Sequence, residues 1–256
     1  MRLVLLCLTL CCSQVSAKVI RAAVGWDRPP YVIEKSESGF EIELTRQILA
    51  EDGHEFQPVF TLIGKASEML LSGNIDMVLT IDIKHRVDPE LLTEPYVVYQ
   101  NVAVTLRQRA IRLSRVNELR LHSVIAFKDA SNLLGTEFAD TVKPSKKYLE
   151  AAITERQIKL LMVGSVDVVV MDRHILAFLV KKLPLRLQRE LSIHPLFDVM
   201  PYRAAIIDPE IRAQFDNTLN VFMRNGRYQR LLDEFGLVNL LDKLPVRDGQ
   251  FADSDQ

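Results

Sequence analysis

One sequence pattern occurs twice in this chain and constrains its fold more than any other feature. It spans residues 70–82 and returns at residues 161–172. Each copy consists of the end of an apolar helix, a glycine, an aspartate in the following turn, a continuously apolar strand, and an acidic residue where the strand stops. A glycine closes a helix readily because it adopts the left-handed conformation without steric strain. A strand that is apolar on both faces is typical of a parallel sheet covered by helices on both sides. The repeat therefore predicts two α/β lobes, with their chemistry at the carboxyl ends of the strands.

Composition agrees with two lobes and argues against some functions. The chain has 256 residues, of which 48% are apolar and 25% charged, and globular domains usually take roughly 100 to 200 residues. The net charge of −1 gives no electrostatic reason to expect a nucleic-acid partner. The histidines have no metal-ligand spacing, and the sequence contains no nucleophile motif or phosphate-binding loop. We therefore expect no metal, no cofactor and no catalytic residue.

The N-terminal segment has the features of a secretory signal peptide. In Met1–Ala17 an arginine precedes the apolar run Leu3–Cys12, and small residues occupy the positions that a signal peptidase recognises. We predict cleavage before Lys18, export to the periplasm and a mature chain without cysteine, since all three cysteines lie in this segment. A membrane anchor is disfavoured because the apolar run is too short for roughly 30 Å of hydrocarbon. Lipid attachment at Cys11 or Cys12 remains an alternative, although neither is preceded by a small residue.

The first part of the mature chain alternates strands and helices. Strand patterns at 19–26, 55–60 and 74–80 are separated by helix patterns at 40–53 and 65–72. Strands joined through single helices imply right-handed crossovers and a mostly parallel sheet.

A second lobe follows a long β-rich run at 97–106 and a basic stretch at 107–115, which together indicate a crossover. Its strands are predicted at 123–127 and 166–171, and its helices at 130–134, 154–163 and 173–182. The chain should cross back near 195–202, and its last part should contain a strand at 204–207 and two helices. We assign residues 18–107 and 200–256 to lobe 1 and residues 108–199 to lobe 2.

A set of short motifs runs through the chain in a fixed order: Gly25–Tyr31 with its Pro-Pro-Tyr, Ser38–Leu44, Leu71–Asp76, Arg86, Glu94–Tyr96, Gly164–Asp167 and Asn225–Tyr228. In order and spacing, this set resembles family 3 of the bacterial extracellular solute-binding proteins, the periplasmic receptors of amino-acid ABC transporters. The resemblance runs from about Val19 to Phe235. It implies a two-lobed α/β fold of the type II periplasmic-binding-protein kind. Each lobe would be a mostly parallel sheet flanked by helices, and two hinge crossovers would let the lobes close around a ligand.

The resemblance also implies two ligand anchors. In amino-acid binders of this family, an arginine after the third strand clamps the α-carboxylate, and an aspartate that ends a strand of the second lobe accepts the α-ammonium. By position these are Arg86 and Asp172. A guanidinium offers a planar fork to a carboxylate, and a carboxylate satisfies the donors of an ammonium. The alternative roles are a solvated surface arginine for Arg86 and a helix N-cap for Asp172, which is compatible with ligand contact.

The sequence departs from the family next to Arg86. This arginine follows Asp76 earlier than is usual in the family, and Ile83 holds the position of the usual threonine. Thr80 is then the candidate hydroxyl donor to the ligand, and Asp82 is placed to pair with Arg86. These changes leave room for a cationic or modified ligand in place of an ordinary α-amino acid.

Four more residues are candidate ligand contacts. Ser131 and the adjacent helix amides are candidate donors to an anion. Trp26, Tyr31 and Phe60 are candidate aromatic contacts for the apolar part of a ligand, with packing in the core as their alternative role.

The predicted function is that of a periplasmic receptor, a monomer and not an enzyme. It would capture a small polar solute, an amino acid or related amine, in the interlobe cleft for an ABC permease of the inner membrane. One alternative is a sensor that reports its ligand to a membrane kinase or chemoreceptor. The other is a dehydratase on the same fold, which would need a suitably placed general acid.

Overall fold

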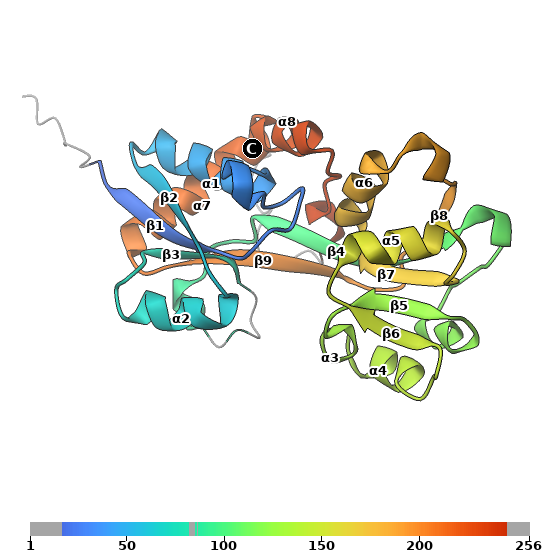
Figure 1. The fold of residues 1–256 in the computed structure, drawn as a ribbon. Helices are drawn as coiled ribbons and strands as arrows, with labels where there is room; N and C mark the ends of the chain where they lie inside the picture. Colours follow the sequence, from blue (N-terminus) through green and yellow to red (C-terminus); the bar gives the residue numbers. More distant parts are fainter. Residues whose placement is uncertain (1–16, 82–84, 86, 245–256) are drawn as a thin grey trace, which may run out of the picture.

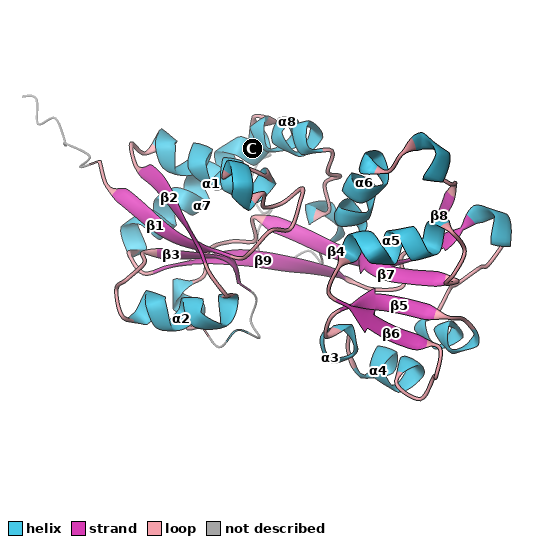
Figure 2. Ribbon diagram, viewed as in Figure 1, coloured by secondary structure: helices cyan, strands magenta, loops and turns pink. Residues whose placement is uncertain are grey.

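In the computed structural model, which describes residues 17–81, 85 and 87–244, the chain forms two lobes (Figure 1). Within these residues one nine-stranded sheet runs through both lobes in the order β2-β1-β3-β9-β4-β7-β5-β6, with β8 paired to β4. Helices cover both faces of the sheet in each lobe (Figure 2). The predicted α/β fold class is confirmed. The sheet as a whole is mixed, because the strands that connect the lobes run antiparallel to their neighbours.

Lobe 1 is built on three parallel strands, β1 (Val19–Val24), β2 (Glu55–Phe60) and β3 (Met77–Ile81), with β9 (Val199–Ile206) antiparallel beside β3. Its helices are α1 (Phe40–Glu51), α2 (Ile63–Leu71), α7 (Pro209–Arg224) and α8 (Arg227–Phe235). Short 3-10 helices are η1 (Glu34–Ser36), η3 (Pro89–Leu91) and η7 (Leu241–Lys243).

Lobe 2 repeats this plan with the parallel strands β5 (Val124–Phe127), β6 (Tyr148–Ala151) and β7 (Val168–Asp172), and with β8 (Leu191–His194) on the other side of β4. Its helices are α3 (Ala130–Leu133), α4 (Thr136–Val142), α5 (Thr154–Met162) and α6 (Arg173–Lys182). The 3-10 helices η4 (Arg107–Arg109), η5 (Val116–Leu121) and η6 (Leu185–Leu187) lie in its connections.

The strand β4 (Val97–Leu106) passes from one lobe into the other. Its residues 97–100 pair with β9, and from Asn101 onward it pairs with β7. The strand partner therefore changes at Gln100–Asn101, before the crossover expected after Leu106. The strand is almost wholly buried across this point. The polar pair Gln100-Asn101 interrupts its apolar run there, but this pair does not by itself show which strand each half pairs with. The predicted residue ranges of the two lobes remain predictions.

Several predicted boundaries differ from those observed. Helix α2 begins at Ile63, and β9 begins at Val199, well before the strand expected at 204. The helix α4 and the strand β6 were not predicted. Both are short, and neither presents the long apolar periodicity on which such predictions depend.

The repeated strands β3 and β7 are buried along their whole length, as the repeat predicts. In α1, which the helix pattern at 40–53 predicts, the apolar stripe of Phe40, Leu44 and Ile48 is entirely buried. Each of these side chains stabilises the folded state by roughly 1.5–3 kcal/mol through removal of apolar surface from water. Packing of these elements on the sheet fixes where the strand ends, and therefore the site, must lie.

None of the helices that the structure describes is long and apolar enough to cross a membrane. The predicted signal peptide 1–17, with Cys11 and Cys12, lies outside the described residues except for its last residue.

Candidate functional site

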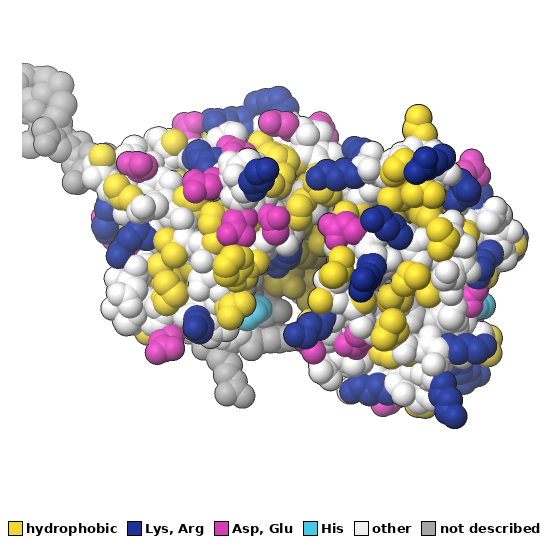
Figure 3. Space-filling view, in the orientation of Figure 1, with side chains coloured by type: hydrophobic (Ala, Val, Ile, Leu, Met, Phe, Trp, Pro, Cys, Tyr) yellow, Lys and Arg dark blue, Asp and Glu magenta, His cyan; other side chains and the backbone are white. Residues whose placement is uncertain are grey.

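A cavity of about 800 Å³ lies between the two lobes. In the space-filling view of Figure 3, the surface is hollowed between the two lobes. Both lobes contribute to the walls, which consist of Asp27, Arg28, Pro29, Thr80, His85, Tyr99, Asn101, Phe127, Leu133, Leu134, Ala152, Ile153, Thr154, Glu155, Met171, Asp172, Ile175, Leu179, Met200 and Tyr202. Many of these residues follow the carboxyl ends of parallel strands, where ligands bind in open α/β sheets. The cavity is the candidate ligand site.

The lobe 1 wall is backed by a fully buried carboxylate, Glu41, in the first turn of α1. It accepts hydrogen bonds from the hydroxyl groups of Thr80, at 2.7 Å, and of Tyr96 and Tyr99. Burial, together with the Glu41 carboxylate, raises the pKa of Tyr96 well above its usual value, so this phenol remains a donor. A buried carboxylate is tolerated only when it is hydrogen-bonded and near a cation, and the cation here is Arg28.

Arg28 follows β1, and its side chain is 31% exposed. Its Nη2 atom donates to Oγ1 of Thr80 at 3.1 Å and lies 4.0 Å from Oε1 of Glu41. The guanidinium also lies over the ring of Tyr99, with 5.6 Å between Cζ and the ring centroid, which is within the range of a cation–π interaction. These contacts hold a positive charge at the lobe 1 wall of the cavity.

Thr80 connects the arginine to the carboxylate and is strained. It has a φ of 59° at an irregularity in the pairing of β3 with β9. A β-branched residue in this left-handed region is destabilised by roughly 1–3 kcal/mol. Its backbone N–H donates to the hydroxyl of Tyr96 at 3.0 Å. This conformation places its side-chain hydroxyl between Arg28 and Glu41.

The start of α1 holds two site residues together. Gly39 precedes the helix with a φ of 112°, and a Cβ atom there would lie 2.4 Å from the carbonyl oxygen of Tyr31. The N–H of Glu41 donates to the same carbonyl oxygen at 3.0 Å. A glycine is required at position 39 because both its conformation and the space around it exclude a side chain.

Asp172 ends β7 and is only 6% exposed. Its carboxylate accepts the backbone N–H groups of His174, Ile175 and Gln100 at 2.8, 3.0 and 3.2 Å. It also lies 3.1 and 3.2 Å from the hydroxyl oxygen of Tyr31. The N-cap role of Asp172 is therefore confirmed. Burial raises the pKa of Asp172 in spite of these hydrogen bonds.

The neighbours of Tyr31 determine which of its hydrogen bonds it donates and which it accepts. Nε2 of His174 lies 3.0 Å from the backbone N of Val238, whose N–H must donate to it. The proton of the neutral ring is then on Nδ1, which lies 2.8 Å from the Tyr31 oxygen, so this phenol accepts from His174 and donates to Asp172. Burial lowers the pKa of His174 to about 4, which keeps the ring neutral at pH 7.

The lobe 2 wall is largely apolar. Phe127 and Leu134 line it, and Leu133 and Ile153 remain 50% and 53% exposed. The amides at the start of α3 do not face the cavity as free donors, because Asp129 and Ser131 donate their N–H groups to the Glu150 carboxylate at 2.7 and 2.9 Å.

Only some of the predicted site residues line the cavity. Thr80 and Asp172 line the cavity. Tyr31 is fully buried behind Asp172, Trp26 is 51% exposed outside the lining, and Phe60 packs on the lobe 1 core. Ser131 is bound to Glu150. Asp82 and Arg86 lie outside the described residues. Ligand contact by all of these predicted residues stays a prediction. For Trp26, Phe60 and Ser131, the positions just described do not favour it.

Sequence reasoning missed Arg28, Glu41 and Tyr99. Arg28 does follow the first strand closely, and a charged side chain just beyond a strand end is a usable signal. Glu41 resembles an ordinary acid in the first turn of a helix, which is a favourable surface position. No local pattern shows that hydroxyl groups from β3, from β4 and from the residue before β4 converge on it.

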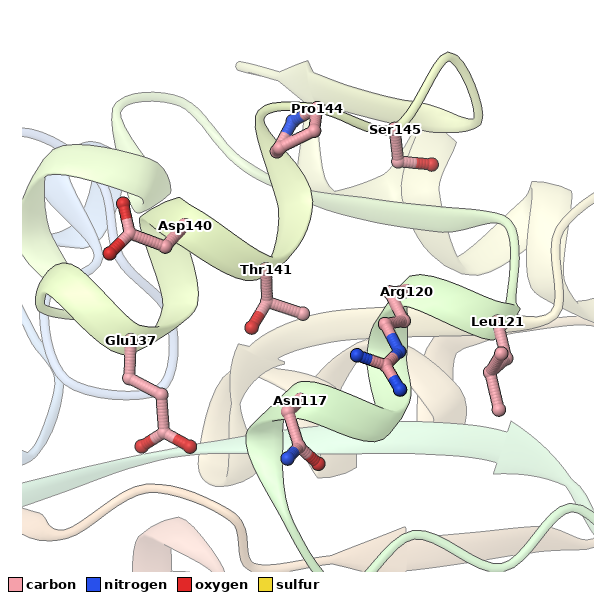
Figure 4. Close-up of a pocket in the computed structure, with 8 residues that line it drawn as sticks. All are labelled: Asn117, Arg120, Leu121, Glu137, Asp140, Thr141, Pro144 and Ser145. Atoms are coloured by element: carbon pink, nitrogen blue, oxygen red, sulfur yellow. The ribbon is translucent and has the colours of Figure 1, made fainter.

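A second hollow, of about 620 Å³, lies on the outer side of lobe 2 between η5 and α4. In Figure 4 the acidic side chains of Glu137 and Asp140 point away from Arg120, and Leu121 is 67% exposed. The polar groups do not converge on one point, so this hollow is not the candidate site. In the described part of the chain, no group of three or more acidic, histidine or cysteine side chains is arranged to hold a metal ion.

The chain matches the family described as bacterial extracellular solute-binding proteins, family 3, over residues 20–238. A comparison with curated proteins finds no match. Similar solved structures include an ancestral arginine-binding protein bound to arginine, with 20% identity, coverage of 85% of this chain and 97% of that chain, and a TM-score of 0.63. A histidine kinase sensor domain with similarity to periplasmic binding proteins has 20% identity, coverage of 85% and 95%, and a TM-score of 0.63. An ancestral amino-acid-binding protein, a precursor of cyclohexadienyl dehydratase, has 19% identity, coverage of 85% and 94%, and a TM-score of 0.62. At these identities the likeness concerns the fold, which is that of type II periplasmic binding proteins.

Proposed function

Because the chain belongs to family 3 of the bacterial extracellular solute-binding proteins, we propose that it is a periplasmic receptor for a small organic solute. The solute is held between the lobes and presented to an ABC permease, and amino acids are the first candidates. The mature receptor acts as a monomer and does not turn its ligand over.

The observation that carries this proposal is the interlobe cavity. Its walls come from both lobes and combine a cation, Arg28, with an apolar surface around Phe127 and Leu134. Ligand sites of this kind are mostly apolar clefts with a few polar groups that fix orientation. The two lobes are linked through β4 and β9, and closure by a hinge is a common response of such proteins to a ligand.

A thermal-shift screen of the mature chain, residues 18–256, against amino acids, amines and small carboxylates tests the proposal. A ligand that binds only the folded state adds about 2.7 kcal/mol at a hundred times its dissociation constant. Small-angle scattering should then show a smaller radius of gyration with the ligand present. If no solute in the screen stabilises the protein, the receptor function is contradicted.

Export is tested separately from binding. We expect mass spectrometry of a periplasmic fraction to detect a chain that begins at or near Lys18, with residues 1–17 removed. An intact N-terminus in the cytoplasm would contradict a role in transport. A lipid-modified Cys11 or Cys12 would replace the soluble receptor with an anchored one.

A sensor is the second candidate, and the likeness to a histidine kinase sensor domain favours it. Co-purification from membranes separates the two: a permease as the bound partner supports transport, and a kinase or chemoreceptor supports sensing.

A dehydratase is the third candidate, since a structural neighbour is a precursor of such an enzyme. Asp172 is the buried acid with a raised pKa at the cavity, but its carboxylate is occupied by Tyr31 and by backbone donors. We expect no turnover of prephenate or arogenate.

A further inference from the structure

The guanidinium of Arg28 has hydrogen-bonding capacity that the described residues do not use. Its Nη2 atom donates to Thr80 at 3.1 Å. Its Nε atom is buried and has no hydrogen-bond partner among the described residues. A guanidinium carries five donors in a planar fork that suits a carboxylate. A buried donor without a partner is unfavourable in the absence of a ligand.

The charge of Arg28 is also incompletely used. Among the described residues, the carboxylate that pairs with it is that of Glu41, 4.0 Å away and beyond hydrogen-bond distance. The oxygens of Glu41 already accept from Thr80, Tyr96 and Tyr99. Glu41 therefore stabilises the charge of Arg28 at the wall without binding its donors. An anion in the cavity can take those donors.

The lobe 2 groups that would recognise an α-amino acid are occupied by the protein itself. The Asp172 carboxylate has about four lone-pair positions, and three backbone N–H groups and the Tyr31 hydroxyl donate to it. The amides of Asp129 and Ser131 donate to Glu150. The Asp172 carboxylate and these two amides therefore offer no unused partner to an ammonium or to a second anion.

Apolar surface takes up the rest of the lobe 2 wall. Leu133 and Ile153 line the cavity and are 50% and 53% exposed, and Phe127, Leu134 and Leu179 also belong to the lining. Exposed apolar side chains around a hollow mark a binding surface. A ligand with an apolar body would bury them at roughly 25 cal/mol for each Å² removed from water.

Building on the proposed receptor function, we propose that Arg28 anchors the ligand, and that the ligand is an organic carboxylate with an apolar body that needs no α-ammonium. The carboxylate binds the free donors of Arg28 on lobe 1. The apolar body lies against Phe127, Leu134 and Ile153 on lobe 2.

Nine compounds test the ligand class, and three of them are the amino acids L-leucine, L-phenylalanine and L-tryptophan. Three are the acids that these become without the amino group: 4-methylpentanoate, 3-phenylpropanoate and indole-3-propanoate. The last three are the amines that they become without the carboxylate: 3-methylbutylamine, phenethylamine and tryptamine. We expect calorimetry on the mature chain to show binding of at least one deaminated acid within tenfold of the affinity of its amino acid, and no binding of the matching amine. Binding of an amine, or an amino acid that binds more than tenfold tighter than its deaminated acid, would overturn the proposal. A preference of that kind would point to Asp27 or Glu155, the exposed acids of the lining, as the anchor.

Variants test the residue. Arg28→Met should weaken binding of the acid by roughly 10- to 100-fold, the effect of losing charged hydrogen bonds, and Arg28→Lys should recover only part of it. The control is Arg46→Met, because Arg46 also lies on lobe 1 over an aromatic ring, 5.7 Å from the Phe56 centroid, but away from the cavity. The double variant Arg28→Met with Glu41→Gln removes both charges, so it tests binding if the single variant fails to fold. Unchanged affinity in Arg28→Met or in the double variant would overturn the proposal.

The two proposals fail in different ways. If none of the nine compounds binds while other solutes in the broad screen do, the carboxylate proposal is overturned and the receptor function stands. If no solute binds at all, both are overturned.

Discussion

The hydroxyl oxygen of Tyr31 lies 3.1 Å from Oδ1 of Asp172, so a loop of lobe 1 is hydrogen-bonded to the last residue of β7 in lobe 2. Both residues are buried. Burial and the Asp172 carboxylate raise the pKa of Tyr31 well above its usual value, so the phenol keeps its proton and remains a donor. This contact joins the two lobes behind the cavity, beside the point where β4 changes partners at Asn101.

The substitution Tyr31→Phe should lower the free energy of unfolding by about 1–2 kcal/mol, because Asp172 and His174 each lose a buried hydrogen-bond partner. We also expect the radius of gyration of the ligand-free protein to increase, since a link between the lobes is removed. Tyr228→Phe is the control: this buried phenol donates to the carbonyl oxygen of Tyr96 at 3.0 Å, within lobe 1. It should lower stability without changing the radius, and an equal change in both variants would show that the Tyr31 contact does not hold the lobes.

Stability should depend on pH through His174. Its pKa is lowered to about 4 by burial, whereas a histidine in an unfolded chain has a pKa of about 6.5. Between these values the unfolded state binds the extra proton. The contribution of the neutral ring is therefore fully present above about pH 6.5 and is lost as the pH falls toward 4, by about 2–3 kcal/mol.

Urea unfolding of the wild type and of His174→Gln between pH 4 and pH 8 checks this dependence. The stability difference, wild type minus variant, should be largest above pH 6.5 and should shrink at lower pH. Other groups, such as Asp216 with a pKa raised to about 6 by burial, are common to both proteins and cancel in the difference. A difference that does not vary with pH would mean that His174 is not the titrating group.

Removal of the Glu41 charge should be strongly destabilising. In Glu41→Gln the amide faces hydroxyl donors, and Arg28 loses its neighbouring negative charge, so we expect a loss of about 2–4 kcal/mol in chemical denaturation. Glu43→Gln on the same helix is the control, because Glu43 is partly exposed and ion-paired with Arg46, and exposed pairs contribute at most about 1 kcal/mol. Equal, small losses in the two variants would show that the network around Glu41 is not stabilising.

Most of the fold was predictable because its signals are local. The continuous apolar runs of β3 and β7 and the stripe of α1 are each visible in a few consecutive residues, and all are buried as expected. The partner change in β4 is not local. Gln100 and Asn101 pair with strands nearly a hundred and about seventy positions away. This polar pair does interrupt the run 97–106, but it does not reveal those distant partners.

The site was predictable only in part, for a related reason. Asp172 was identified from its place at a strand end, and it does line the cavity. Its hydrogen bond with Tyr31 joins residues 141 positions apart, which a reading of consecutive residues does not reveal. The same holds for Glu41, whose hydrogen-bond partners are Thr80 in β3, Tyr99 in β4 and Tyr96 just before β4. The Arg28 donors that have no partner among the described residues depend on these distant contacts as well.

The junction between Gly39 and Tyr31 offers the sharpest test of how the sequence supports the site. A Cβ at position 39 would lie 2.4 Å from a backbone oxygen that cannot move alone, whereas a Cβ at Gly53, which also has a positive φ of 77°, would meet nothing within 4 Å. Gly53→Ala should therefore lose only about 1 kcal/mol from backbone strain. Gly39→Ala should lose roughly 3 kcal/mol or more, because strain and a backbone clash act together. The displaced Tyr31 carbonyl would also release the N–H of Glu41, so this variant should bind a ligand of the interlobe cavity more weakly, and Gly53→Ala should bind it normally. Denaturation and calorimetry on the two alanine variants measure both effects, and equal losses would mean that the close approach at Gly39 does not order the site.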